Sequence, residues 1–358
     1  MRVIQLIDSL ALGGAERVAV NFANALADQG YSSFLCTSRK EGPLKKALHQ
    51  DVGYLYLNRK STLDRAALRR LHEFVQSNDI EIIHAHTTSF FLAYALSRWN
   101  PQLNLIWHVH HGGYQHSRSP KQLLHRWLSK RFETIITVNE ELKQWAESRL
   151  GHHKVYYLPN FASHSEESLT LETLEGEAGK RLVCVANWRP EKNHSLLFKA
   201  LDQVLVEYPD WTLHLFGNRP DTAYAKVLSD MLQSNNRLQE GIIDHGAVPG
   251  VSHHLHQFDL AVLSSFSEGL PMTLLEYGLA GLPVVCTNVG QCAEVLGDSG
   301  QLVPSDDVDA MQQALIRYIA DPELRKQHGA ALRQRIQSQY EAQKIMGQLV
   351  DIYEQIIA

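Results

Sequence analysis

Two glutamates stand eight positions apart, on either side of a short turn and the expected start of a helix. Glu268 directly precedes Gly269, Leu270 and Pro271, whereas Glu276 falls within the helix expected after this turn. Pro271, with its fixed φ, fits the first position of that helix, and the backbone amides at a helix start can hold an anion. Carboxylates accept hydrogen bonds from hydroxyl groups. The pattern therefore indicates two separated contacts to a polyol, beside a site for an anion.

Carboxylates at this spacing are also common on a solvated helix face, so the pair alone carries little weight. Glu276, however, lies in an otherwise apolar stretch that contains Leu274, Leu275, Tyr277 and Leu279. An unpaired charge among such side chains would be costly. We therefore expect the Glu276 carboxylate to have a partner.

A pair of glycines follows the first apolar run of the chain. Gly13 and Gly14 lie between the strand expected at Val3 to Ile7 and an amphipathic helix that ends near Gly30. Glycine lets the backbone approach a ligand closely, although paired glycines are equally typical of plain loops. The full Gly-x-Gly-x-x-Gly fingerprint of nicotinamide-binding sites is missing here.

Histidine is abundant, with 19 residues in the chain. His84 and His86 stand at one expected strand end, and His108, His110 and His111 stand at another. Alternate residues of a strand face the same side, so these rings meet one requirement of a zinc site. A hydrogen-bonded structural histidine is the commoner outcome, and we expect no metal ion here.

Two cations, Arg189 and Lys192, follow an expected strand of the second half and precede a helix. Positive groups fixed in a dry cleft can clamp a diphosphate and strongly stabilise it as a leaving group. The spacing alone fits a solvated turn with ordinary charges equally well.

The segment around Glu268 and Glu276 closely resembles the Glu-x7-Glu region of retaining glycosyltransferases of family 4. That family has the GT-B fold, which consists of two facing Rossmann-like domains with a cleft between them. Its first glutamate contacts the donor sugar and its second contacts the ribose hydroxyls, so the resemblance implies these roles for Glu268 and Glu276. Trp107-His108-Val109-His110 is similar to the family's strand that ends in a histidine facing the reacting sugar, which implies this role for His110.

The resemblance spans nearly the whole chain, with the motifs in the family's order. It implies His110 and Glu268 as catalytic residues. The donor-binding residues that it implies are Gly13, Gly14, Arg189, Lys192, Gly269, Leu270, Pro271, Thr273 and Glu276. One departure stands out, because Asn187 occupies the place where many members have arginine. Lys192 is therefore the firmer of the two cation assignments, and Arg189 is expected to reach the phosphates instead.

Asp307 and Asp309 superficially match the Asp-x-Asp metal motif of the other large glycosyltransferase fold, GT-A. Both precede an amphipathic stretch, and acidic residues favour a helix start because they cap it and complement its dipole. We therefore interpret these residues as helix caps, and we expect neither a metal ion nor another cofactor.

Length and composition agree with a globular protein of two domains. The chain has 358 residues, of which 44% are hydrophobic and 20% charged, and this balance is globular. The formal net charge of −5 argues against nucleic acid as a partner. The four cysteines are scattered without Cys-x-x-Cys spacing, and no leader or membrane-spanning run is evident, so we expect a cytoplasmic location.

Short apolar runs alternate with helical stretches along the chain, which predicts an α/β fold with parallel sheets. We expect a first Rossmann-like domain over residues 1–162, a polar linker over 163–179 and a second Rossmann-like domain over 180–339. A C-terminal helix at about 340–358 is expected to pack back on the first domain. Twelve strands are predicted, seven before the linker and five after it, and the residues after Thr287 are predicted to be helical.

With the resemblance to family 4, these observations predict a retaining, metal-independent glycosyltransferase of bacterial-type polysaccharide, lipopolysaccharide or glycolipid assembly, which uses a nucleotide-diphosphate-sugar donor and a glycan or lipid-linked hydroxyl acceptor. A nucleotide-sugar epimerase of the same fold and a non-catalytic nucleotide-sugar-binding protein are the alternatives. The stretch from Ser119 to Arg131 carries four cations beside Leu123, Leu124, Trp127 and Leu128. A basic amphipathic helix can dock on an anionic inner membrane face, but we expect its apolar stripe to face the core.

Overall fold

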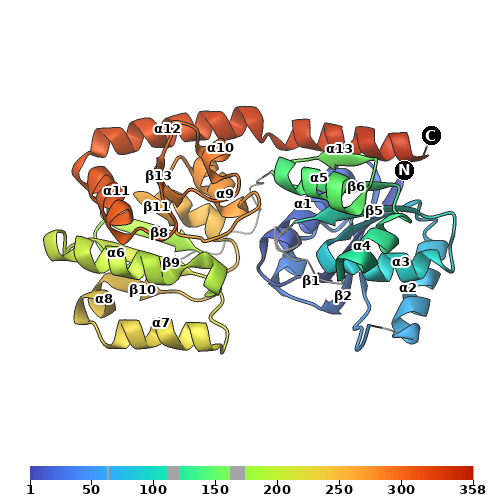
Figure 1. Cartoon of the computed structure of the whole chain (residues 1–358), viewed down its shortest axis with the longest axis horizontal. Helices are drawn as coiled ribbons and strands as arrows, with labels where there is room; N and C mark the ends of the chain where they lie inside the picture. The colour runs from blue at the N-terminus through green and yellow to red at the C-terminus, as the bar shows by residue number, and fades with distance from the viewer. Residues whose placement is uncertain (63, 111–120, 162–173, 358) are drawn as a thin grey trace. The chain divides into compact units, whose positions relative to one another are not determined.

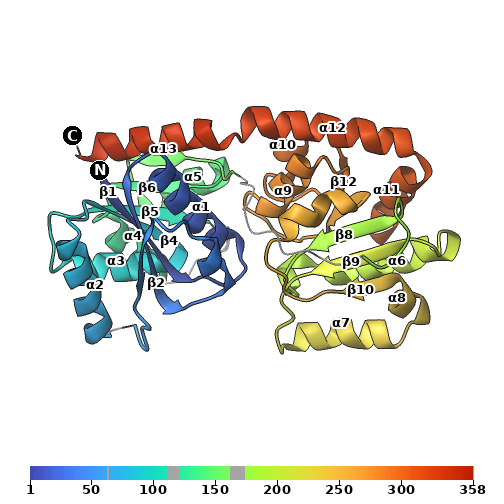
Figure 2. The same cartoon turned by 180° about the vertical axis from the view of Figure 1, so that it is seen from behind.

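The computed structural model describes residues 1–62, 64–110, 121–161 and 174–357, and the chain forms two compact units. The first unit comprises Met1–Phe161 together with Ala342–Ala358, and the second comprises Ala162–Glu341. Each unit contains one wholly parallel sheet flanked by helices (Figures 1 and 2). Of the expected linker, residues 163–173 lie outside the described residues, and Leu174 is buried in the second unit.

The sheet of the first unit has the strand order β3-β2-β1-β4-β5-β6-β7. Its strands are β1 (Arg2–Ser9), β2 (Ser32–Lys40), β3 (Gly53–Tyr56), β4 (Ile82–His86), β5 (Asn104–Val109), β6 (Thr134–Thr137) and β7 (Val155–Tyr157). Its longer helices are α1 (Gly14–Asp28), α2 (Arg65–Ser77), α3 (Phe90–Ser97), α4 (Lys121–Ser129), α5 (Glu140–Trp145) and α13 (Ala342–Ile357). Strand order reverses between β1 and β4, because the chain builds outward from β1 to β3 and then returns to the other side.

Neighbouring residues of β5 show how the two faces of this sheet are covered, since successive side chains of a strand point to opposite faces. On one face, the Trp107 ring stacks on Phe90 of α3 at 4.2 Å between centroids and lies near Trp145 of α5. On the other face, the His108 ring stacks on Phe22 of α1 at 5.8 Å. Burial of aromatic rings on both faces holds the strand in register with its neighbours.

The sheet of the second unit has the order β10-β9-β8-β11-β12-β13, with a reversal between β8 and β11. Its strands are β8 (Arg181–Val185), β9 (Thr212–Phe216), β10 (Ile242–Asp244), β11 (Leu260–Leu263), β12 (Val284–Thr287) and β13 (Gln301–Val303). Its helices are α6 (His194–Glu207), α7 (Ala223–Gln233), α8 (Asn236–Gly241), α9 (Met272–Ala280), α10 (Cys292–Leu296), α11 (Val308–Ala320) and α12 (Pro322–Gln339).

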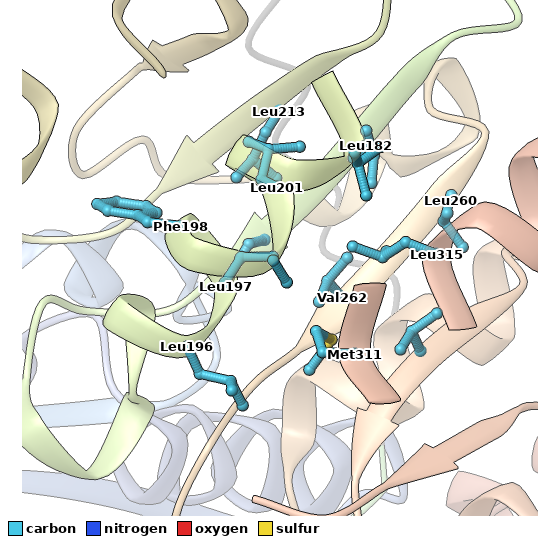
Figure 3. Packing of buried hydrophobic residues seen from close by; sticks show 14 of the residues in the cluster. Leu182, Leu196, Leu197, Phe198, Leu201, Leu213, Leu260, Val262, Met311 and Leu315 are labelled. Atoms are coloured by element: carbon cyan, nitrogen blue, oxygen red, sulfur yellow. The ribbon is translucent and has the colours of Figure 1, made fainter. Parts of the chain in front are cut away.

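The main hydrophobic core of the second unit lies between this sheet and two helices, α6 and α11 (Figure 3). Leu197 and Leu201 from α6 and Leu315 from α11 are fully buried against the strand residues Leu213 and Leu260. The positions 197 and 201 are one helical turn apart, so both side chains lie on the same face of α6. This packing fixes α6, and with it the segment that joins β8 to α6.

Twelve strands lie where the sequence predicts them, and one strand was missed. The prediction of helix after Thr287 was wrong for β13, which pairs with β12 through three residues. The middle residue, Leu302, is 37% exposed, so this short edge strand lacks the apolar run that marks the others. The prediction for Asp307 is confirmed, because its carboxylate caps α11 by accepting a hydrogen bond from the Ala310 amide at 2.8 Å.

Candidate active site

The ends of β8 and β11 form the centre of the candidate site in the second unit. These two strands are neighbours, but the chain continues from β8 to β9 on one side and from β11 to β12 on the other. In open parallel sheets, ligands bind at the carboxyl ends of strands where the order reverses in this way. Residues 186–193 follow β8 and residues 264–271 follow β11, so both segments begin at this edge.

Lys192 and Glu268, one from each of these segments, form an ion pair. Lys192 Nζ lies 2.6 Å from Glu268 Oε1, and the Ser265 hydroxyl donates to the same oxygen at 2.6 Å. The Glu268 side chain is only 8% exposed and that of Lys192 is 25% exposed. A charged hydrogen bond at this depth is stronger than one in water. The structure therefore brings together two residues that the sequence predicted for one site.

Backbone hydrogen bonds and one unusual residue hold the two segments in place. The Phe266 amide donates to Glu191 O at 2.8 Å, and the Ser264 hydroxyl donates to Lys192 O at 3.0 Å. Asn193 adopts a left-handed conformation, with φ of 48°, which asparagine tolerates better than most residues. Lys192 thus lies in a short 3₁₀ turn (Pro190–Lys192) that is tied to the segment after β11.

Gly269, Leu270 and Pro271 form the turn that leads into α9. The expectation that Pro271 is the first helical residue was wrong by one position, because its ψ of 116° is extended and the helix begins at Met272. The Pro271 carbonyl accepts a hydrogen bond from the Leu274 amide at 3.1 Å, as the carbonyl of a residue preceding a helix does. The first helical turn therefore begins four positions after Glu268, and the amides of a first turn lack partners within the helix.

Tyr277 fastens α9 to the end of β8. The Val185 amide donates to the Tyr277 hydroxyl at 2.7 Å, and the Thr273 hydroxyl donates to Val185 O at 3.4 Å. Burial raises the pKa of Tyr277 well above its usual value, so its hydroxyl stays protonated. Glu276 adjoins this face of α9 and is half-buried, whereas Leu274 and Leu275 are fully buried. Glu276 therefore lies between two residues of α9, Thr273 and Tyr277, that contact the end of β8.

Arg189 differs from Lys192 in its surroundings. Its side chain is 60% exposed, and its ion-pair partner is Glu191, with Nη1 and Oε1 3.9 Å apart. Another cation of this region was not singled out from the sequence. The guanidinium of Arg219, from the segment after β9, stacks over the Trp188 ring at 4.4 Å from its centroid. An aromatic face attracts a cation, and Arg219 also lies 3.5 Å from the Asp244 carboxylate.

Gly290 was also missed by sequence reasoning, although it follows β12 as the other site segments follow their strands. It has φ of +53°, and a Cβ atom there would lie 2.2 Å from Glu268 O and 2.8 Å from Gly269 O. The Gln291 amide also donates to Gly269 O at 3.0 Å. Only glycine fits this close approach, which supports the turn that carries Glu268.

In the first unit, Gly13 and Gly14 lie at the turn between β1 and α1. Gly13 precedes the helix and Gly14 is its first residue. A Cβ atom at Gly13 would lie 2.3 Å from Glu16 Oε2, while Glu16 Oε1 accepts a hydrogen bond from the Ser9 hydroxyl at 2.7 Å. Glycine at position 13 thus leaves room for the Glu16 carboxylate to fold back over the turn, at the strand end beside β4.

His110 belongs to a buried array of four histidines at the ends of β4 and β5. His84 Nε2 lies 3.1 Å from His108 Nδ1, and His86 Nδ1 lies 2.9 Å from His110 Nε2. The two hydrogen-bonded pairs stack on each other, with ring centroids 4.6 Å apart for His84 and His86 and 4.0 Å apart for His108 and His110. Burial lowers the pKa of His84, His86 and His108 well below its usual value, so these rings are neutral. His111 lies outside the described residues.

The same array is the candidate for a metal site. One nitrogen from each of His84, His86 and His108 lies within 4.8 Å of the others. The rings of His84 and His86, however, stack with 7° between their planes. Lone pairs of imidazole nitrogens lie in the ring plane, so those of parallel stacked rings point side by side instead of converging on one ion. A tetrahedral metal site requires convergence, and the arrangement favours hydrogen bonding between the rings.

The neutral histidines predict acid instability of the first unit. An unfolded histidine has a pKa of 6.5, and the pKa of these buried histidines is depressed in the folded state. As the pH falls below 6.5, the unfolded chain takes up protons that the folded chain does not bind. The stability of the fold is therefore complete above pH 6.5 and is lost as the pH falls. Three such histidines should lower the free energy of unfolding by roughly 3 kcal/mol between pH 6.5 and 5.5. Urea denaturation, read by hydrogen-exchange pulses at fixed pH over β4 and β5, measures this loss. Replacement of the exposed His153 by glutamine should leave this loss of stability unchanged. A stability that does not vary between pH 6.5 and 5.5 would contradict the assignment of His84, His86 and His108 as neutral.

Gly290→Ala should destabilise the second unit more than a glycine replacement without a clash. Gly246 also has positive φ, at +67°, but nothing lies within 4 Å of its built Cβ. Gly246→Ala should therefore lose about 1 kcal/mol through backbone strain alone. Gly290→Ala should lose at least about 2 kcal/mol, because the Glu268 carbonyl must also move. Urea unfolding of the two variants tests this difference, and equal losses would show that the turn yields freely.

Two family models match the chain. The model described as Glycosyltransferase Family 4 matches residues 12–166, and the model described as Glycosyl transferases group 1 matches residues 179–321. These two ranges contain every residue singled out above as a catalytic or donor-binding candidate.

Similar proteins agree with this match. A lipopolysaccharide core biosynthesis mannosyltransferase from Rhizobium leguminosarum is 24% identical over 65% of this chain and 67% of its own length. The Escherichia coli UDP-Gal:alpha-D-GlcNAc-diphosphoundecaprenol alpha-1,3-galactosyltransferase is 22% identical over 87% of this chain and 86% of its own. The crystal structure of Anabaena HepE in complex with UDP and glucose has a TM-score of 0.81 at 17% identity, and covers 99% of this chain and 100% of its own. The chain is therefore a glycosyltransferase with the GT-B fold, and it belongs to glycosyltransferase family 4.

Proposed function

We propose that this glycosyltransferase moves a sugar, with retention of configuration, from a nucleotide-diphosphate-sugar to a hydroxyl group of a glycan or lipid-linked acceptor. Glu276 binds the ribose, Glu268 binds the transferred sugar, and Lys192 with Arg189 neutralises the diphosphate. The turn Gly269, Leu270 and Pro271, with Thr273 in the first turn of α9, binds the phosphates through backbone amides of the residues other than Pro271, which has no N–H. Gly13, Gly14 and His110 serve the reacting end of the donor.

The observation that carries this proposal is the Lys192–Glu268 ion pair at the ends of β8 and β11. A sugar diphosphate has hydroxyl groups and anionic oxygens side by side, and this site offers a carboxylate and an ammonium group side by side. Both hydrogen bonds to Glu268 reach Oε1. A carboxylate can accept further hydrogen bonds through its second oxygen, so Glu268 can bind a hydroxyl group while it retains Lys192.

We propose further that transfer needs no metal ion. The segments that follow β8 and β9 supply positive charge through Lys192, Arg189 and Arg219. Such charge can stabilise a leaving diphosphate in place of a metal ion. Asp307, from the superficial metal motif, caps α11 instead. A nucleotide-sugar donor is in line with the UDP and glucose bound by HepE, the structural relative described above.

The names of two relatives support a proposal for the acceptor and for the place of the reaction. The E. coli relative acts, by its name, on a diphosphoundecaprenol-linked sugar, and the Rhizobium relative acts in lipopolysaccharide core biosynthesis. No helix in the described part of this chain is long and apolar enough to cross a membrane. We propose that the enzyme works in the cytoplasm and meets a lipid-linked acceptor by peripheral contact with the inner membrane face.

Helix α4 offers a surface for this contact, and the expectation that its apolar stripe faces the core was wrong for three of its four residues. Leu128 is buried, but Leu123, Leu124 and Trp127 are 71%, 46% and 59% exposed. They are three of the nine exposed large apolar side chains of the described residues, and their spacing puts them on one continuous helix face. Arg126 and Lys130, also exposed, flank that face. Exposed apolar side chains flanked by cations favour an anionic lipid surface.

A panel of radiolabelled nucleotide-sugars, each tested with a hydroxyl acceptor before and after exhaustive chelation, tests the reaction. We expect transfer of label to the acceptor, with activity unchanged by chelation. Release of an isomerised free sugar would identify an epimerase, and binding without turnover would identify a non-catalytic binding protein. Loss of turnover that only magnesium or manganese restores would overturn the metal-free proposal.

Glu276→Ala should weaken donor use while the fold stays intact, because the carboxylate is proposed to bind ribose. Loss of hydrogen bonds to a charged group corresponds to roughly 1.5 to 3 kcal/mol, or about a 10- to 150-fold loss in kcat/KM for the donor. The control is Glu240→Ala, which removes an exposed carboxylate from helix α8 of the same unit. Unchanged donor kinetics in a folded Glu276→Ala protein would remove Glu276 from the site.

Vesicle co-sedimentation tests the proposed membrane contact. Replacement of Leu123, Leu124 and Trp127 by serine should abolish binding to vesicles rich in anionic lipid, and Arg126→Gln with Lys130→Gln should weaken it, since each cation contributes about 1 kcal/mol. Arg131 is left unchanged, because its guanidinium donates to Pro101 O and Leu103 O at 2.7 and 3.0 Å.

The matched control for this test replaces Val206 and Val227, which are also exposed but lie in the second unit, by serine. This control should bind vesicles as the wild type does. Equal binding by all four proteins, or no binding by any of them, would mean that the acceptor reaches the enzyme without help from α4.

A further inference from the structure

The hydrogen bonds of the histidine array continue to two residues that sequence reasoning did not single out, Gln5 in β1 and Tyr353 in α13. His86 Nε2 lies 2.8 Å from Gln5 Oε1, and Gln5 Nε2 donates to the Tyr353 hydroxyl at 3.2 Å. The Tyr353 hydroxyl in turn lies 2.6 Å from His84 Nδ1. Gln5, Tyr353, His84 and His86 are all completely buried. The network therefore links three strands and the last helix within the first unit.

Each member of this network has a restricted choice of roles. A neutral imidazole carries one N–H donor and one lone pair, so the assignment of one ring nitrogen determines the other. Burial keeps the rings of His84 and His86 neutral, and it raises the pKa of Tyr353 so that its hydroxyl keeps its proton. The amide of Gln5 donates only through nitrogen and accepts only through oxygen. The positions of the hydrogen atoms in this network therefore follow from the orientation of the Gln5 amide.

One arm of the network runs from Gln5 to His110. Gln5 Oε1 can only accept, so His86 Nε2 must carry the proton. His86 Nδ1 then has the lone pair, and it accepts a hydrogen bond from His110 Nε2 at 2.9 Å. His110 consequently carries a proton on Nε2, which in a neutral ring is the tautomer with a bare Nδ1.

The other arm runs from the same amide in the opposite direction. Gln5 Nε2 donates to Tyr353, whose hydroxyl can then donate to His84 Nδ1. His84 Nε2 carries the proton of the next bond, to His108 Nδ1 at 3.1 Å. The two arms agree with each other because both start at Gln5. To reverse either arm, the amide would have to turn over and all bonds would have to change direction together, which makes the network cooperative.

We propose that Gln5 and Tyr353 are positioning residues that hold His110 with its proton on Nε2 and so fix the orientation of its ring. The part that His110 plays at the reacting end of the donor rests on the proposed function, whereas the position of this proton does not. The last helix of the chain thereby takes part in the chemistry of a site built on β4 and β5, through the Tyr353 hydroxyl.

Nuclear magnetic resonance of the full chain with 15N-labelled histidine tests the tautomer directly, because the shifts of Nδ1 and Nε2 differ between the protonated and bare states. The signals of His110 are identified by their loss in His110→Asn. We expect the wild type to show the proton on Nε2. Gln5→Met removes the acceptor of His86, and Tyr353→Phe removes the acceptor of the Gln5 amide, so each should give a mixture of both tautomers at His110.

Tyr156→Phe is the matched control. The Tyr156 hydroxyl donates to Gln355 of the same helix α13 at 3.0 Å but lies outside the network, so this variant should keep the wild-type tautomer. A wild type with the proton on Nδ1 would overturn the proposal. If a folded variant keeps the His110 proton wholly on Nε2, the residue replaced in that variant does not position His110. Tyr353→Phe is the smaller change, so the proposal can still be tested if Gln5→Met fails to fold.

Kinetics separate positioning from structural support. Loss of one neutral hydrogen bond in the network should reduce kcat by about 3- to 10-fold, with the KM for the donor within twofold of the wild type, because the site for the donor diphosphate is untouched. A merely structural effect would raise KM and lower the melting temperature in parallel. Should no donor be turned over at all, the proposed function fails while the tautomer result still stands.

Discussion

The reversal of strand order within each parallel sheet is the constraint on which the rest of the structure depends. Between β8 and β11, and between β1 and β4, adjacent strands send their following segments in opposite directions. The backbone groups at such an edge are not covered by a crossing connection, so polar side chains can gather there. In the second unit this edge carries Lys192 and Glu268, and in the first unit it carries the glycine turn and His86.

Sequence reasoning succeeded where the physical cause is local. Buried parallel strands read as apolar runs and helix caps read as short polar residues, so twelve strands and the cap at Asp307 were predicted. It failed at β13, because the three residues of this strand form no apolar run. It also failed at α4, because the spacing of apolar residues is the same whether they face a core or solvent. Amphipathic spacing identifies a helix but not what covers its apolar face.

The parts of the site that could not be predicted depend on contacts between distant residues. Tyr353 is 269 positions from His84, and the Gly290 turn is recognisable as a requirement only once Glu268 O is seen to lie against it. The resemblance to family 4 supplied candidates such as Lys192 and Glu268, and the geometry added what holds them, namely Ser265, Tyr277 and Gly290. Motifs thus identify residues that touch a ligand more readily than the residues that position them.

The two units stabilise buried polar groups in different ways, and the difference suits different tasks. In the second unit the partly exposed Lys192 ammonium group pairs with the largely buried Glu268 carboxylate, and a buried charge is tolerated only while it has an opposite charge or hydrogen bonds. Under the proposed function, a diphosphate shares Lys192 while hydroxyl groups share Glu268. In the first unit burial keeps His84, His86 and His108 neutral, and the chain of hydrogen bonds that starts at Gln5 leaves little freedom in the placement of protons. Neutral rings cannot neutralise a leaving group, but they can hold the ring of His110 in a fixed orientation. Under the proposed function, charge is therefore managed by the unit that holds the donor, and orientation by the unit that carries His110.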